Sequence, residues 1–205
     1  MDIRLNFINR ADDPHHSQLL IFARNPETSL DEIAAAWTVI ADFRPDMTYA
    51  VLYPADTGIN VQDSFGNFTP MLPAEAGRHF RVMESEDGMI VELADDAGPP
   101  DQIILANALR QGAVNVGLYK DKRLYLGERH ILPEQTAAFR LKPTLWVGVA
   151  SQSDPDAGRS SAILSSVATE ISLLGLASAD IVMTGGGAGA NAGPLVFTLE
   201  NIVTA

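Results

Sequence analysis

Apolar and polar residues alternate along most of this chain in short runs, which is the period of a β-strand. Clear examples are Phe80 to Glu84, Gln102 to Asn107 and Thr136 to Leu141. Turn residues separate the runs, as in Ser85-Glu86-Asp87-Gly88, where an Asp-Gly pair suits a hairpin. The pattern predicts an all-β chain, and we expect an antiparallel β-sandwich of the jelly-roll type.

Some runs are apolar at consecutive positions, most clearly Leu19-Leu20-Ile21-Phe22. A strand with one face in solvent should alternate, so we expect both faces of these strands to be covered. Either other segments of the chain or another subunit could provide the cover, and the second alternative predicts a homo-oligomer. The same two alternatives apply to the segment after Arg159, which contains no further Lys, Arg or His.

Two stretches of the chain resemble each other. Pro45-Asp46-x-Thr48-x-Ala50 matches Pro133-Glu134-x-Thr136-x-Ala138 at an offset of 88 positions (133 minus 45), and Asn9 matches Asn107 at an offset of 98 (107 minus 9). The first copy would then carry about ten extra residues, within 25–33. We therefore predict two related β units, 1–97 and 98–205, packed as one pseudo-symmetric body, with a single domain over 1–205 as the alternative.

Residues 30 to 42 permit two interpretations. The capping-box spacing of Ser29 to Glu32, followed by apolar residues at helical spacing, favours a helix. The repeat favours a strand, because it aligns residues 36–40 with 124–128, which read as a strand. We predict a strand over residues 35–41.

The charge balance restricts the partners. The formal net charge is −12, and the 14 Lys and Arg residues are scattered, so we expect no nucleic-acid partner. No apolar run approaches the ~18 residues of a membrane-spanning helix, and no signal peptide is visible. The absence of Cys excludes disulfides and thiolate metal sites. We expect no cofactor, and a chain that is cytoplasmic or released without a signal peptide.

The densest set of potential metal ligands is Asp12, Asp13, His15 and His16. Two imidazoles and two carboxylates suit zinc or another transition metal. Adjacent His residues on a strand point to opposite faces, so one ion would need a loop geometry here. The alternative is a turn of solvated polar residues.

Two further motif-like segments are interpreted as turns. Gly185 to Gly193 contains a G-x-G-x-x-A spacing, but a dinucleotide site needs a following helix and an acid about twenty residues later, and the chain ends first. We interpret it as a glycine-rich loop that joins two strands. Asp154 to Gly158 lacks the later Glu and the flanking helices of a calcium loop.

No Gly-x-Ser-x-Gly nucleophile elbow and no diagnostic motif of a single family is present. The leading hypothesis is a non-enzymatic β-sandwich that acts by self-assembly or by binding a protein partner. The first alternative is a carbohydrate- or membrane-binding module of lectin or toxin type, and the second is a hydrolase with a spatially assembled carboxylate/His site. The aromatic residues that suit a sugar site or a core are Trp37, Trp146, Tyr49, Tyr53, Tyr119 and Tyr125.

Overall fold

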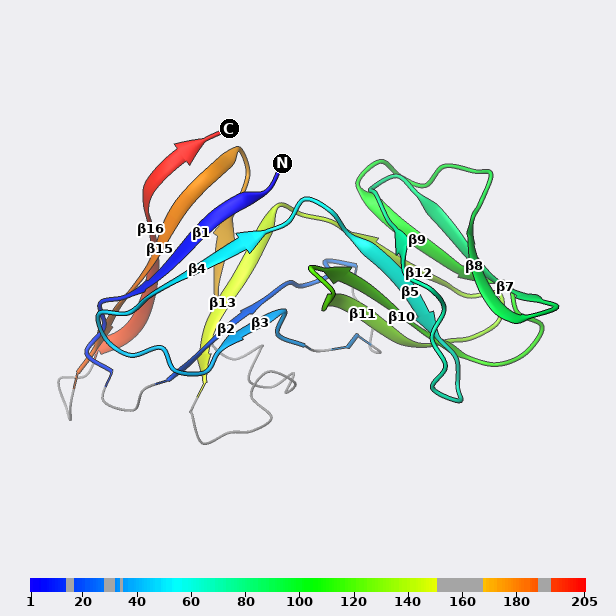
Figure 1. Ribbon diagram of the computed structural model, residues 1–205, viewed down its shortest axis with the longest axis horizontal. Coiled ribbons are helices and arrows are strands. Elements are labelled where there is room, and N and C mark those ends of the chain that lie inside the picture. Colours follow the sequence, from blue (N-terminus) through cyan, green and yellow to red (C-terminus); the bar gives the residue numbers. More distant parts are fainter. Residues whose placement is uncertain (14–16, 28–31, 34, 151–167, 188–192) are drawn as a thin grey trace. The chain divides into compact units, whose positions relative to one another are not determined.

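The structure is a computed structural model that describes residues 1–205 except 14–16, 28–31, 34, 151–167 and 188–192 (Figure 1). The described residues form strands arranged in four sheets of four, with no helix among them. The all-β prediction is confirmed. The described part of the chain contains no helix that is long and apolar enough to cross a membrane.

The chain divides into two compact units. The first unit contains Met1–Ala23, Ala35–Ala55 and Pro143–Ala205, and the second contains Arg24–Ala34 and Asp56–Lys142. The expected boundary after residue 97 falls between strands of the second unit. Each compact unit takes strands from both halves of the chain. The boundary after residue 97 therefore remains a prediction about the two sequence copies, and it is not a boundary between the compact units.

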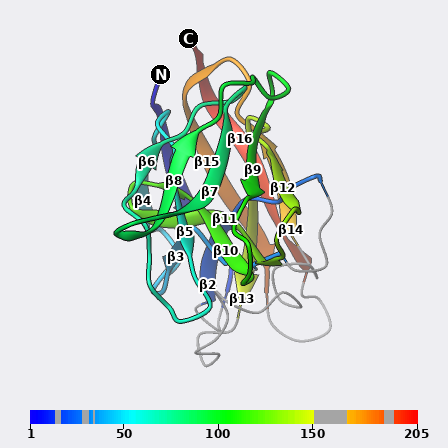
Figure 2. The same ribbon diagram turned by 90° about the vertical axis from the view of Figure 1, so that its right-hand side faces the viewer.

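The first unit consists of two sheets, with strand orders β16-β15-β1-β4 and β14-β13-β2-β3 (Figures 1 and 2). Its strands are β1 (Ile3–Asn9), β2 (Gln18–Phe22), β3 (Thr38–Ile40), β4 (Thr48–Tyr53), β13 (Thr144–Ala150), β14 (Ala168–Ser172), β15 (Leu176–Gly186) and β16 (Gly193–Thr204).

The second unit also consists of two sheets, with strand orders β11-β10-β5-β6 and β12-β9-β7-β8. Its strands are β5 (Gly58–Gln62), β6 (Leu72–Pro73), β7 (His79–Ser85), β8 (Gly88–Leu93), β9 (Gln102–Asn107), β10 (Val114–Lys120), β11 (Arg123–Ile131) and β12 (Thr136–Arg140).

The two units have the same strand pairings. β1 to β4 occupy the places of β9 to β12, and β13 to β16 occupy the places of β5 to β8. The correspondence includes direction, because β1 pairs parallel with β15, as β9 does with β7. Each unit therefore combines the first four strands of one half of the chain with the last four strands of the other.

The parallel pairs differ from the wholly antiparallel jelly roll that the strand pattern favoured, although the other pairings between named strands are antiparallel. Short alternating strands have the same period in both kinds of ladder, so alternation does not specify direction. The direction is set by the chain topology. β8 pairs with one edge of β7, and the chain then crosses to the other edge of β7 to form β9.

A buried Asn ends the first strand of the first unit. The Asn9 side chain is fully buried, donates to the carbonyl of Phe43 at 2.6 Å and accepts from the N–H of Ala11 at 2.8 Å. Its backbone N–H donates to the carbonyl of Met47. These bonds fix the turn that leads into β4.

Asn107 makes the same contacts in the second unit. Its side chain donates to the carbonyl of Ile131 at 2.8 Å and accepts from the N–H of Leu109 at 3.0 Å, and its backbone N–H donates to the carbonyl of Gln135. All three partners follow their first-unit counterparts at the sequence offsets of the two motifs. The resemblance between the two stretches is therefore also a resemblance in contacts.

The strand predicted over residues 35–41 is β3, three residues long. Trp37 and Ile40 are buried, while Val39 between them is exposed. The helical spacing of the apolar residues therefore does not form a helix, because β3 pairs with β2 instead. Pairing supplies the hydrogen bonds that a helix would have made internally.

Both faces of β2 are buried. Leu19 and Ile21 are fully buried, and Leu20 and Phe22 on the opposite face are 1% and 2% exposed. These values apply to a single chain, so no second subunit is needed to cover this strand. Of the two alternatives for the consecutive apolar run, cover from within the chain is the one observed.

Candidate functional site

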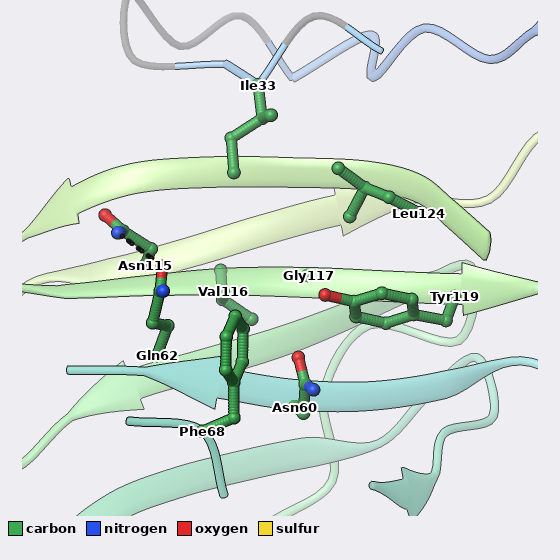
Figure 3. Close-up of a pocket in the computed structure, with 9 residues that line it drawn as sticks. All are labelled: Ile33, Asn60, Gln62, Phe68, Asn115, Val116, Gly117, Tyr119 and Leu124. Carbon is green, nitrogen blue, oxygen red and sulfur yellow. Dashed lines mark hydrogen bonds between the residues drawn. The ribbon is translucent and has the colours of Figure 1, made fainter. Parts of the chain in front are cut away.

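The outward face of β5 and β10 in the second unit carries a small cavity of about 160 Å³ (Figure 3). The alternation of the two strands builds it, because Ile59, Val61 and Leu118 are buried in the core while the intervening residues point outward. We call it the amide pocket. Its lining residues are Ile33, Asn60, Gln62, Phe68, Asn115, Val116, Gly117, Tyr119 and Leu124.

The ring of Tyr119 lies over Gly117 and forms part of the pocket. A Cβ at Gly117 would lie 2.6 Å from Cε2 of Tyr119 and 2.9 Å from its hydroxyl, so a side chain there would displace the ring. Burial raises the pKa of the Tyr119 phenol, and a hydrogen bond between the phenol and the Asn60 side chain lowers it by a smaller amount. The phenol is thus a neutral hydrogen-bonding group at physiological pH.

Asn60 presents an unused hydrogen-bond acceptor. Its Oδ1 atom is buried and accepts no hydrogen bond from the described residues. Most buried polar atoms are paired, because an unpaired one costs about 1–3 kcal/mol. Asn60 Oδ1 is therefore an acceptor at the wall of the amide pocket with no donor among the described residues.

The other two amides are held in place by the sheet. Asn115 Nδ2 donates to Gln62 Oε1 at 3.3 Å across the β5/β10 pair, and Asn115 Oδ1 accepts from the N–H of His130 at 3.1 Å. His130 has φ 55 and lies where the β10/β11 register shifts. Such irregularities reorient groups beside a site, and here one turns an N–H towards Asn115.

The inserted segment of the first sequence copy closes one side of the amide pocket. The N–H of Ile33 donates to the carbonyl of Gly127 at 2.8 Å, and the Ile33 side chain lies so close to Gly127 that a Cβ there would be 2.8 Å away. The side chain of Asn25 anchors the other end of the segment to β12 through Ala138 and Arg140.

A second, more open cavity of about 460 Å³ adjoins the amide pocket, and we call it the loop cavity. The loop that follows β5 begins at Asp63. The Asp63 carboxylate accepts hydrogen bonds from the N–H groups of Phe65 and Asn67, both at 2.8 Å. Hydrogen bonds lower the pKa of Asp63, and the bond from the Asn67 side chain has the largest effect. The cavity is lined by Gln62, Asp63, Ser64, Phe65, Gly66, Ala113, Asn115 and His130.

The predicted metal ligands are only partly placed. Asp13 is buried and its carboxylate accepts from the N–H of Ser17 at 2.7 Å, while Asp12 forms a backbone bridge with Gly186. His15 and His16 lie outside the described residues. The described part of the chain contains no group of three or more potential ligands, and the metal site stays a prediction.

The glycine-rich segment, predicted as a loop, extends into both strands: Gly185 and Gly186 end β15, and Gly193 begins β16. Gly185, Gly186 and Gly187 have positive φ, and Gly187 donates its N–H to the carbonyl of Asp12 at 2.6 Å. A side chain at Gly186 would collide with the same carbonyl. These glycines therefore serve close backbone contact, and the rest of the segment, 188–192, is outside the described residues.

Of the six aromatic residues considered for a sugar site, Tyr119 lines the amide pocket, whereas Trp37, Tyr53 and Tyr125 are buried. The amides Asn60, Gln62 and Asn115 were not expected there. Their signal in the sequence is the alternation of these polar residues with buried apolar ones in β5 and β10, which is also the pattern of an ordinary solvated face.

Comparison of the chain with protein-family models, with curated proteins and with solved structures found no match.

Proposed function

We propose that this protein is a non-enzymatic binding protein and that its second unit holds a neutral saccharide in the amide pocket. The observation that carries the proposal is the buried, unpaired Oδ1 of Asn60 in a cavity lined by amides and aromatic rings. A sugar hydroxyl would supply the missing donor. The proposal corresponds to the carbohydrate-binding module that was the first alternative from the sequence.

The chemistry of the lining favours a neutral ligand. All nine lining residues are uncharged, and a charged ligand would lose its hydration without gaining a counter-charge. Amides donate and accept at once, which matches hydroxyl groups, and the rings of Phe68 and Tyr119 suit the C–H face of a sugar. The cavity is smaller than the roughly 300–1,000 Å³ of sites for drug-sized ligands, so it suits a single ring.

Binding is a better proposal than self-assembly or hydrolysis. The apolar run of β2, which favoured assembly, is buried within one chain. For hydrolysis, a free acid and base would have to face the ligand, whereas Asp63 at the adjoining cavity is engaged by its own loop. We also propose that each unit is a β-sandwich and that the two are copies of one ancestral unit, which the matched pairings support.

The test is a screen of the purified chain on an array of neutral glycans, followed by calorimetry with the sugars that bind. We expect Asn60→Ala to weaken binding at least tenfold, which corresponds to about 1.4 kcal/mol. Gln111→Ala removes an exposed amide of the same unit outside both cavities and is the matched control. Binding that is unchanged in Asn60→Ala, or no binding by any neutral glycan, would contradict the proposal.

A further inference from the structure

The amide pocket and the loop cavity share two lining residues, Gln62 and Asn115. These two side chains are hydrogen-bonded to each other at 3.3 Å, and they border both cavities from neighbouring strands. The boundary is therefore a pair of amides rather than a wall of core side chains. A molecule in the amide pocket that extends past this pair enters the loop cavity.

Each cavity has an aromatic ring from the same loop. Phe68 lines the amide pocket and is 58% exposed, and Phe65 lines the loop cavity and is 89% exposed. Two exposed rings on one loop give an apolar surface beside the two cavities. The loop therefore offers one stacking surface to each cavity.

Hydrogen bonds within the loop hold the backbone that carries these rings. Besides the two backbone bonds described above, the Asn67 side chain donates to Asp63 Oδ2 at 2.8 Å, and the N–H of Asp63 donates to the carbonyl of Asn67 at 2.9 Å. The N–H of Thr69 then donates to the carbonyl of Val61, which ties the end of the loop to β5. A fixed loop lowers the entropy lost on binding.

The two cavities differ in chemistry. The amide pocket is neutral and partly enclosed by Ile33, whereas the loop cavity is larger and includes Asp63, Ser64 and His130. The more open cavity tolerates substituents and chain continuation, while the smaller one accepts a defined ring. A chain-like ligand can therefore place one unit in the smaller cavity and continue into the larger one.

We infer that the ligand is an oligosaccharide of at least two sugar units, with a terminal unit in the amide pocket and the next unit in the loop cavity against Phe65. The inference rests on the proposed saccharide function and adds the ligand's length and direction. The amide pair Gln62–Asn115 lies under the glycosidic linkage and fixes the position of the second unit relative to the first.

The test measures affinity against ligand length by calorimetry, with the full chain and three neutral series of one to four units: β-1,4-linked glucose, α-1,4-linked glucose and β-1,4-linked N-acetylglucosamine. In the series that binds, we expect the dissociation constant to fall at least tenfold from one unit to two and to change less than threefold beyond that.

Two Phe variants separate the cavities. Phe65→Ala should weaken disaccharide binding at least fivefold and leave the monosaccharide unchanged, whereas Phe68→Ala should weaken both. Leu174→Ala is the matched control, because it removes an exposed apolar side chain (76% exposed) from the first unit. Asn60→Ala should weaken ligands of every length.

The outcomes distinguish the two proposals. Equal affinity for one and two units, with Asn60→Ala still impaired, overturns the extended site and leaves the proposed function standing. Absence of binding by every series overturns both. Co-sedimentation with phosphatidylcholine vesicles that is lost in Phe65→Ala, together with no length dependence, would instead assign the loop to a lipid surface and overturn the inference.

Discussion

The two units place different side chains on one shared framework, and the difference is clearest between β2 and β10. Matching of their pairings puts Leu20 of the first unit at the place of Gly117, and Phe22 at the place of Tyr119. Leu20 and Phe22 are buried, whereas Gly117 leaves space that the Tyr119 ring partly fills. The same strand face carries buried apolar side chains in one unit and lines a cavity in the other.

The neighbouring strand follows the same rule. Gly148 of β13 pairs with Leu20 as Asn60 of β5 pairs with Gly117, and Ala150 stands where the second unit has Gln62. The first unit thus has small residues beside large apolar ones, and the second has amides beside a glycine. The backbone pairing is the same in both units, so the difference between the apolar face and the face with the cavity lies in the side chains.

The largest effects should come from what the units share. We expect Asn9→Ala and Asn107→Ala each to lower the free energy of unfolding by about 3 kcal/mol, because each leaves buried backbone groups unpaired. Urea unfolding measures this, with Gln111→Ala as an exposed control. A large loss in one variant and none in the other would break the equivalence of the two units.

The next effect should be confined to the second unit. Gly117→Ala forces the Tyr119 ring aside, and we expect it to cost about 1–2 kcal/mol of stability and to weaken saccharide binding at least tenfold. Gly98→Ala is the matched control, since its new methyl group would meet neighbours no closer than 3.4 Å. Gly117→Ala with normal affinity would show that the Tyr119 position is not needed.

The strands and turns of this fold were accessible from the sequence because they depend on local pattern. The Pro-acid motif shows why: the N–H of Met47 donates to the carbonyl of Arg44, and Asp46 between them has φ 65. Pro at the second turn position followed by a positive φ is the arrangement of a type II turn. The motif recurs because the same turn is needed twice.

Which strands pair with each other could not be predicted from the sequence. β1 pairs with β15 although Asn6 and Asp180 are 174 residues apart, and alternation is identical for a near and a distant partner. The amide pocket was missed for a related reason, because Asn60 and Gln62 fit a solvated face equally well. The inserted segment was visible as extra residues, but its contact between Ile33 and Gly127 arises only in the folded chain.

A smaller change in stability is expected from substitutions in the turn that both units share. Asp46 and Glu134 are non-glycine residues with φ 65 and φ 68, which is strained for an L-residue. We expect Asp46→Gly and Glu134→Gly each to raise the free energy of unfolding by about 0.5 kcal/mol, since the relief of strain exceeds the added flexibility of the unfolded chain. Urea midpoints compare the two variants, and opposite signs would show that the turns differ.

The smallest effect concerns a position where the units differ in charge. Asp180 of β15 takes the place that His79 has in β7, since their partners on β1 and β9 correspond. Hydrogen bonds from Asn201 at 2.7 Å and from Asn6 at 2.8 Å lower the pKa of Asp180.

A lowered carboxyl pKa in the folded state stabilises the fold at pH values above the unfolded pKa of about 3.9, and this contribution is lost as the pH falls through the folded pKa. Asp180→Asn should therefore be slightly less stable than the natural chain at pH 7, and the two should converge below pH ~3. The effect is small because the Asp180 side chain is only partly buried, so water screens its interactions. Urea midpoints across this pH range measure it, and a gap that widens towards low pH would reverse the assignment.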